Sequence, residues 1–153
     1  MGLGILERRR ERILEHRYDN ACRVGADLRF HDAGLLFNSV GFEYRSAVFE
    51  GGSVRKMHEK EALGCYSHSA RNFILEALIR QENAEAAERV TESVYMASIA
   101  AGSAAMGERS KALLGIFNAL MRGAKSSEGV HDKLHAIATE MLKEQRAQGI
   151  SYV

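Results

Sequence analysis

The stretch AGLLFNSVGFEYRSAVF (residues 33–49) decides the fold class, because its apolar residues recur with the period of an α-helix. One set of apolar residues advances in alternating steps of four and three: Ala33, Phe37, Val40, Tyr44 and Ala47. A second set occupies every seventh position: Leu35, Phe42 and Phe49. We therefore expect a helix that is apolar over most of its surface and lies at the centre of the fold or at a subunit contact.

The same helical period continues on both sides of this stretch. We expect one helix within residues 1–30, a third helix near 53–81, a fifth near 109–122 and a last helix ending near 147. The 153 residues include no proline, so nothing interrupts long helices, and no stretch alternates as a strand would. We therefore predict an all-α protein: a single compact bundle-like domain of five or six helices. Its parts are an N-terminal helix (1–30), a helical core (31–147) and a frayed tail (148–153).

Charge and hydropathy exclude two classes of partner. The 21 basic and 20 acidic residues nearly cancel, whereas a protein that neutralises phosphates carries a basic excess. The one basic run, RRRER at 8–12, is interleaved with glutamates, which is typical of a solvated helix face. No window approaches the ~20 apolar residues of a membrane span. We therefore expect neither a nucleic acid nor a membrane as partner.

The chain has two cysteines, Cys22 and Cys65, which are too few for a disulfide framework. The N-terminal apolar run is too short for the core of a secretory signal peptide. We therefore expect a cytoplasmic protein without a disulfide, and the sequence gives no reason to expect a cofactor.

The stretch EALGCYSHSARN (61–72) places four polar side chains on one helix face, all within about 40° of the first: Glu61, Cys65, His68 and Asn72. The apolar residues of this segment lie on the opposite side, so the polar face is expected in water or against another subunit. A catalytic interpretation makes Cys65 the nucleophile, His68 its base and Glu61 a proton relay.

A second polar cluster lies near the start of the last helix. Glu128 and His131 form one Glu-x-x-His pair, and His131 and His135 are four residues apart. Di-iron helical bundles use two such pairs with two further glutamates, and this sequence has one. The cluster is either a metal site or a set of packing residues.

The stretch ASIAAGSAAMG (97–107) is built from small residues at four-residue steps, a pattern that lets two helix backbones approach closely. Gly34 and Gly41 of the second helix offer a matching groove. The run, with Ala101 and Gly102 at its centre, is either an intramolecular packing surface or a self-association seam.

Part of the chain resembles a known family. ESVYMASIAAGSAAMGERSKALL (92–114) is similar to the paired C-terminal helices of the alkylhydroperoxidase-D and carboxymuconolactone decarboxylase group, and EKEALG (59–64) resembles a preceding helix of that group. The family's Cys-x-x-Cys, followed four residues on by His, is absent: His68 stands three residues after Cys65, and Asn72 follows four residues later. The resemblance implies an all-helical oligomeric enzyme with altered or lost chemistry at Cys65 and His68.

Two functions remain open from the sequence. The first is an interaction or assembly module, such as an adaptor, chaperone-like or regulatory protein, that forms a homo-oligomer or binds a protein partner. Its expected interface residues are Phe37, Phe42, Phe49, Ala101 and Gly102. The second is an enzyme that uses Glu61, Cys65 and His68.

Overall fold

The structure, a computed structural model, describes residues 2–49, 55–80, 87–122 and 128–147, and these segments form six α-helices without a strand. The prediction of an all-α bundle of five or six helices is therefore confirmed. The predicted frayed tail (148–153) lies outside the described residues, as do the side chains of Phe49 and Glu128. The helices are α1 (Gly2–Ala26), α2 (Phe30–Phe49), α3 (Arg55–Arg80), α4 (Ala87–Ser103), α5 (Gly107–Met121) and α6 (Glu128–Ala147).

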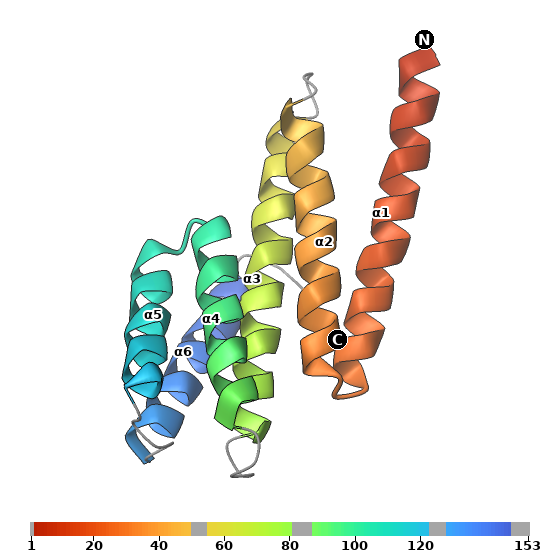
Figure 1. The fold of residues 1–153 in the computed structure, drawn as a ribbon. Coiled ribbons are helices and arrows are strands. Elements are labelled where there is room, and N and C mark those ends of the chain that lie inside the picture. The colour runs from red at the N-terminus through yellow and green to blue at the C-terminus, as the bar shows by residue number, and fades with distance from the viewer. Residues whose placement is uncertain (1, 50–54, 81–86, 123–127, 148–153) are drawn as a thin grey trace.

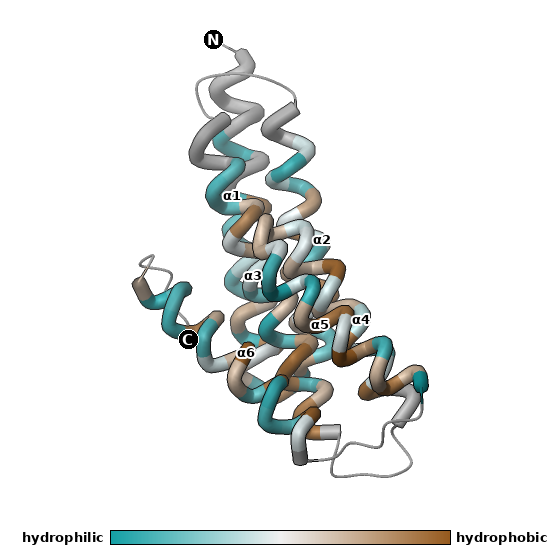
Figure 2. Tube along the Cα trace, turned by 90° about the vertical axis from the view of Figure 1, so that its left-hand side faces the viewer, coloured by the Kyte–Doolittle hydropathy of each residue, from teal (hydrophilic) through white to brown (hydrophobic). Residues whose placement is uncertain are grey.

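The first five helices stand side by side in chain order, each antiparallel to the one before it (Figure 1). α6 runs obliquely across one face of this row, where it packs mainly on α3 (Figures 1 and 2). α3 thus has neighbours on two sides, α2 on one and α4 and α6 on the other. This double contact makes α3 the central helix of the fold.

The contact between α2 and α3 is close because two glycines of α2 face α3. A Cβ atom added to Gly34 would lie 2.8 Å from the Phe73 ring, and one added to Gly41 would lie 3.2 Å from Cβ of Cys65. The Ser69 hydroxyl donates a hydrogen bond of 2.7 Å to the carbonyl oxygen of Gly34. The groove predicted at Gly34 and Gly41 therefore receives α3 and not the small-residue run of 97–107.

The largest apolar cluster joins the C-terminal half of α3 to α4, α5 and α6. Ala97 and Ala101 are fully buried in it, together with Leu113, Leu134 and Met141. Hydrophobic residues are interspersed with hydrophilic ones along α6, as in a helix that buries one face (Figure 2). The apolar side of the small-residue run thus packs within the chain, which favours the intramolecular interpretation of that run.

Two helices end in left-handed residues that are not glycine. Leu28 (φ 63°) and Ala105 (φ 60°) follow α1 and α4, and each is the C′ residue of a Schellman turn. After α4, the amide of Ala105 donates to the carbonyl of Gly102 (3.1 Å) and the amide of Met106 to that of Ala101 (2.9 Å). The predicted N-terminal helix therefore ends at residue 26 and not 30, while α4 ends within the 97–107 run, at Ser103.

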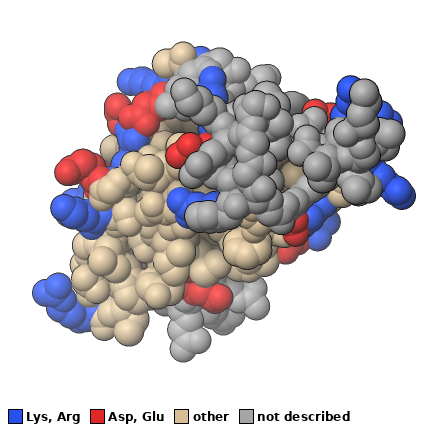
Figure 3. Space-filling view, turned by 90° about the horizontal axis from the view of Figure 1, so that it is seen from above, with Lys and Arg blue, Asp and Glu red and all other residues tan. Residues whose placement is uncertain are grey.

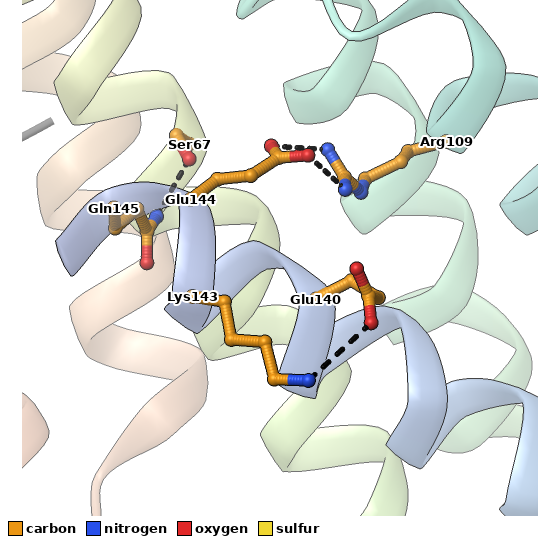
Figure 4. A network of polar contacts seen from close by, with 6 residues as sticks. All are labelled: Ser67, Arg109, Glu140, Lys143, Glu144 and Gln145. Atoms are coloured by element: carbon orange, nitrogen blue, oxygen red, sulfur yellow. Dashed lines mark hydrogen bonds and ion pairs between the residues drawn. The ribbon is translucent and has the colours of Figure 1, made fainter. Parts of the chain in front are cut away.

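Polar contacts attach the end of α6 to its neighbours (Figure 4). The Arg109 guanidinium of α5 makes a bidentate ion pair with the Glu144 carboxylate. The next residue, Gln145, is 1% exposed and donates from Nε2 to the Ser67 hydroxyl of α3 (2.6 Å). Such bidentate and buried contacts fix the position of one helix on another more narrowly than apolar packing does.

Candidate functional site

A cavity of about 420 Å³ lies where α1, α2 and α3 meet. α3 contributes Glu61, Cys65 and His68, which are the three residues predicted from the sequence as a catalytic set. Tyr18 of α1 and Tyr44 of α2 also line it. The structure thus brings the predicted residues to one hollow, and it adds two tyrosines from other helices.

The polar face of α3 is largely buried, which contradicts the expectation that it lies in water or against another subunit. Cys65 and His68 are each 1% exposed and Asn72 is 5% exposed, whereas Glu61 is exposed. A helix at the surface of a domain buries one face. α3 has two buried faces because α1 and α2 cover the side opposite α4 and α6.

His68 is held between the side chains of α1 and α2. Its Nε2 atom lies 3.0 Å from the Tyr18 hydroxyl, and the Phe37 ring stacks on the imidazole with centroids 4.9 Å apart. Burial, and secondarily the positive charge of Arg71, lowers the pKa of His68 to about 3. The imidazole is therefore neutral at physiological pH.

The Cys65 thiol is held in its protonated form. Burial raises the pKa of Cys65 to about 12, and the charge of Glu61 and the neighbouring Cys22 act in the same direction. An activated cysteine needs the opposite shift, because the thiolate is the nucleophile. The site thus resembles a neutral binding surface more than a thiolate centre.

Carboxylates gather at the rim of the cavity. Glu15 and Asp19 of α1 and Glu61 of α3 line it, and Lys60 is the basic residue among the described residues of the lining. Burial, followed by the charge of Glu61 and the hydrogen bond of the hydroxyl to that carboxylate, raises the pKa of Tyr44. The carboxylates at the rim therefore disfavour ionisation of the Tyr44 hydroxyl.

Sequence reasoning missed the lining residues that come from outside α3. Glu15, Asp19 and Tyr18 lie on α1, and no local spacing connects them to residue 61 or 65. Tyr44 belongs to the apolar set of residues 33–47 and was expected to pack, and Tyr18 follows the same helical period within α1. Only the docking of α1 against α3 shows that both tyrosines also face a cavity.

The predicted interface residues divide into buried and exposed ones. Phe37 (3% exposed) and Ala101 (0%) lie inside the chain, contrary to the expectation of an outer contact, because α2 and α4 each turn that face toward α3. Phe42 is 63% exposed on α2, and Gly102 is exposed beside Ser110 of α5. Phe49 cannot be placed, since its side chain lies outside the described residues.

The predicted metal ligands lie on the surface of α6. His131 and His135 are both exposed, with ring centroids 6.4 Å apart. Within the described segments, no group of three His, Cys, Asp or Glu residues has a geometry suited to a metal ion. The side chain of Glu128 lies outside these segments, so a site that includes it stays a prediction.

In the view from above, the basic and acidic side chains of the described residues lie interspersed around an uncharged area (Figure 3). None of the described helices is long and apolar enough to span a membrane. Comparison with protein-family models, with curated proteins and with solved structures gives no significant match. The resemblance of residues 92–114 to the alkylhydroperoxidase-D group thus gains no support from a family model.

Proposed function

We propose that this protein is a helical assembly module that pairs with a second copy of itself through the outer face of α2. The observation that carries the proposal is the exposure of two large apolar side chains on that face. Leu35 is 44% exposed and Phe42 is 63% exposed. They stand seven residues apart, which is two helical turns and about 10 Å along the axis.

The exposed pair lies opposite the face that α2 buries. At about 100° per residue, Leu35 and Phe42 differ by only about 20°, so they form one straight ridge. Phe37 and Tyr44 lie on the far side of the helix, buried against α3. A ridge with a seven-residue period is the arrangement by which two helices pack along their lengths.

The charges beside this ridge suit a second copy of the chain. Glu43 and Arg45 lie about 80° to either side of Leu35 on the helical wheel. In a parallel two-fold pair of α2 helices, each Glu43 therefore faces the Arg45 of the other copy, as charged residues do on the flanks of a coiled coil. The net charge of +1 adds little repulsion between copies.

The test is the mass of the native particle by sedimentation equilibrium at micromolar concentrations. We expect a dimer for the unmodified chain and a shift toward monomer for Leu35→Ser. Leu114→Ser is the matched control, since Leu114 on α5 is 43% exposed, nearly the same as Leu35. A monomeric unmodified chain, or equal effects of the two substitutions, contradicts the proposal.

The orientation of the pair is tested by exchanging charges. Glu43→Arg places like charges across a parallel pair and should weaken it, while the double exchange Glu43→Arg with Arg45→Glu should restore it. Glu43 also lies 3.7 Å from Arg17 within the chain, so unfolding curves of both variants show whether the folded monomer is affected. Failure of the double exchange to restore the dimer contradicts the parallel arrangement.

The enzyme hypothesis is the alternative, favoured by the meeting of Glu61, Cys65 and His68 at one cavity. It requires fast alkylation of Cys65 near neutral pH. We expect slow alkylation instead, because a pKa of about 12 leaves about a thousandfold less thiolate than the ordinary value of 9.0. Rapid iodoacetamide labelling of Cys65 relative to Cys22 would support the enzyme.

Two free thiols, at Cys22 and Cys65, support a reducing compartment, and we propose that the protein acts in the cytoplasm. Fractionation of cells that express the full chain with an epitope tag is the direct measurement. Recovery of the protein in an oxidising compartment, with the two cysteines modified, contradicts this location.

A further inference from the structure

We propose that the cavity between α1, α2 and α3 binds a small organic cation, with its ammonium group at the carboxylate rim and an apolar body inside. This inference does not rest on the proposed pairing of α2. The volume of the cavity, about 420 Å³, falls within the range of small-molecule sites. The side chains at the rim of the cavity and those in its interior together indicate the chemical class of the ligand.

The rim favours a positive charge. Among the described residues, three carboxylates, Glu15, Asp19 and Glu61, line the cavity against one ammonium group, that of Lys60. The charge of Glu61 acts on the Tyr44 hydroxyl, which also lines the cavity. An ammonium group among these oxygens makes charge-assisted hydrogen bonds, whereas an anion there meets repulsion.

The interior is uncharged and partly aromatic. Tyr18 and Tyr44 line it, and the aromatic faces of tyrosines attract cations. Cys65 and His68, each 1% exposed, line its inner part and are both neutral at physiological pH. An apolar or aromatic body of a ligand can pack there without leaving a buried charge unpaired.

The Cys65 thiol gives a second observation that points to a ligand. It is buried, lines the cavity, and makes no hydrogen bond to another described residue. A thiol is a weak donor and a polarizable contact for an apolar group. A thiol at the inner end of the cavity suits the apolar body of a ligand better than its ammonium group.

The experiment compares three probes of similar shape and different charge: 2-phenylethylamine (cation), 2-phenylethanol (neutral) and 3-phenylpropanoate (anion). Binding to the full chain is followed by amide chemical shifts in a ¹H–¹⁵N spectrum. We expect the amine to bind at least about tenfold more tightly than the alcohol, with shifts around residues 15–19 and 60–68. The affinity of the amine should fall as salt is added.

The rim is tested by Glu61→Gln and Asp19→Asn, which remove charge at exposed positions and should leave the fold intact. Each should weaken binding of the amine by up to about fivefold and leave the alcohol unchanged. Glu59→Gln on α3 is the control, because Glu59 is exposed and does not line the cavity. Equal binding of amine and alcohol, no binding of the amine at 10 mM, or unchanged affinity in both rim variants overturns the proposal.

Discussion

The Tyr18 hydroxyl lies 3.0 Å from Nε2 of His68 and joins α1 to α3 across fifty residues of sequence. Tyr18 also meets the Phe37 ring edge-on, with centroids 5.5 Å apart, and Phe37 stacks on His68. The three rings come from three different helices. This aromatic group therefore fixes α1 on the α2–α3 pair beside the cavity.

Removal of the Tyr18 hydroxyl tests how much its contact with His68 contributes to the free energy of unfolding. Tyr18→Phe keeps the ring and deletes one partner of a buried imidazole, so the free energy of unfolding should fall by about 1 kcal/mol. Urea denaturation gives the value. Tyr95→Phe is the control, since Tyr95 is 43% exposed and contacts Phe117 through its ring, and it should change stability by less than about 0.5 kcal/mol. Equal effects of both variants contradict a stabilising role for the contact between Tyr18 and His68.

His68 predicts how stability depends on pH. Its pKa is about 3 in the folded chain and near 6.5 when exposed, so the unfolded chain takes up the proton first as the pH falls. The contribution of neutral His68 is fully present above about pH 6.5 and is lost progressively toward pH 3. Between neutral pH and pH 5 the loss from this residue is about 2 kcal/mol.

The measurement is urea denaturation at several pH values between 5 and 7.5, compared with His68→Gln, which should show a shallower dependence. His135→Gln is the control, since His135 is exposed, and it should keep the slope of the unmodified chain. Because a buried substitution can prevent folding, the His68 ring is also followed by NMR in the unmodified chain. Titration of this ring near pH 6.5 contradicts the prediction.

The turn between α4 and α5 predicts a stabilising substitution. Ala105 has a φ of 60°, a conformation that costs an alanine about 1 kcal/mol more than a glycine. Ala105→Gly should therefore raise the free energy of unfolding by about 1 kcal/mol. The same substitution at Ala112, an exposed position within α5, should lower it by about 1 kcal/mol through lost helix propensity. Thermal denaturation of the two variants should shift in opposite directions.

The fold class could be predicted from the sequence because helical period is a local property. Each helix shows its own apolar spacing, as Ala33, Phe37 and Tyr44 do on α2, and all three are buried as that spacing predicts. The helix end at Ala26 was missed because its turn uses Leu28 where glycine is expected. Without the glycine signal, residues on both sides continue the same period.

The candidate site was predicted in part, and the missing part shows what a sequence lacks. The spacing of Glu61, Cys65 and His68 put them on one face of a helix, and that is correct. Whether this face meets water or another helix depends on where α1 packs. The spacing within α3 contains no information about α1, so burial, and with it the pKa shifts of Cys65 and His68, could not be predicted.

The sequence by itself determined that the chain forms helices, that it lacks a membrane-spanning helix among the described residues, and that small residues allow close packing. Only the tertiary structure decided that α3 has two buried faces, that Phe37 lies inside while Phe42 lies outside, and that Tyr18 and Glu15 share a cavity with Cys65. The physical reason is that helical period follows from neighbours within about four positions. Burial and electrostatics instead follow from contacts between helices that are distant in sequence.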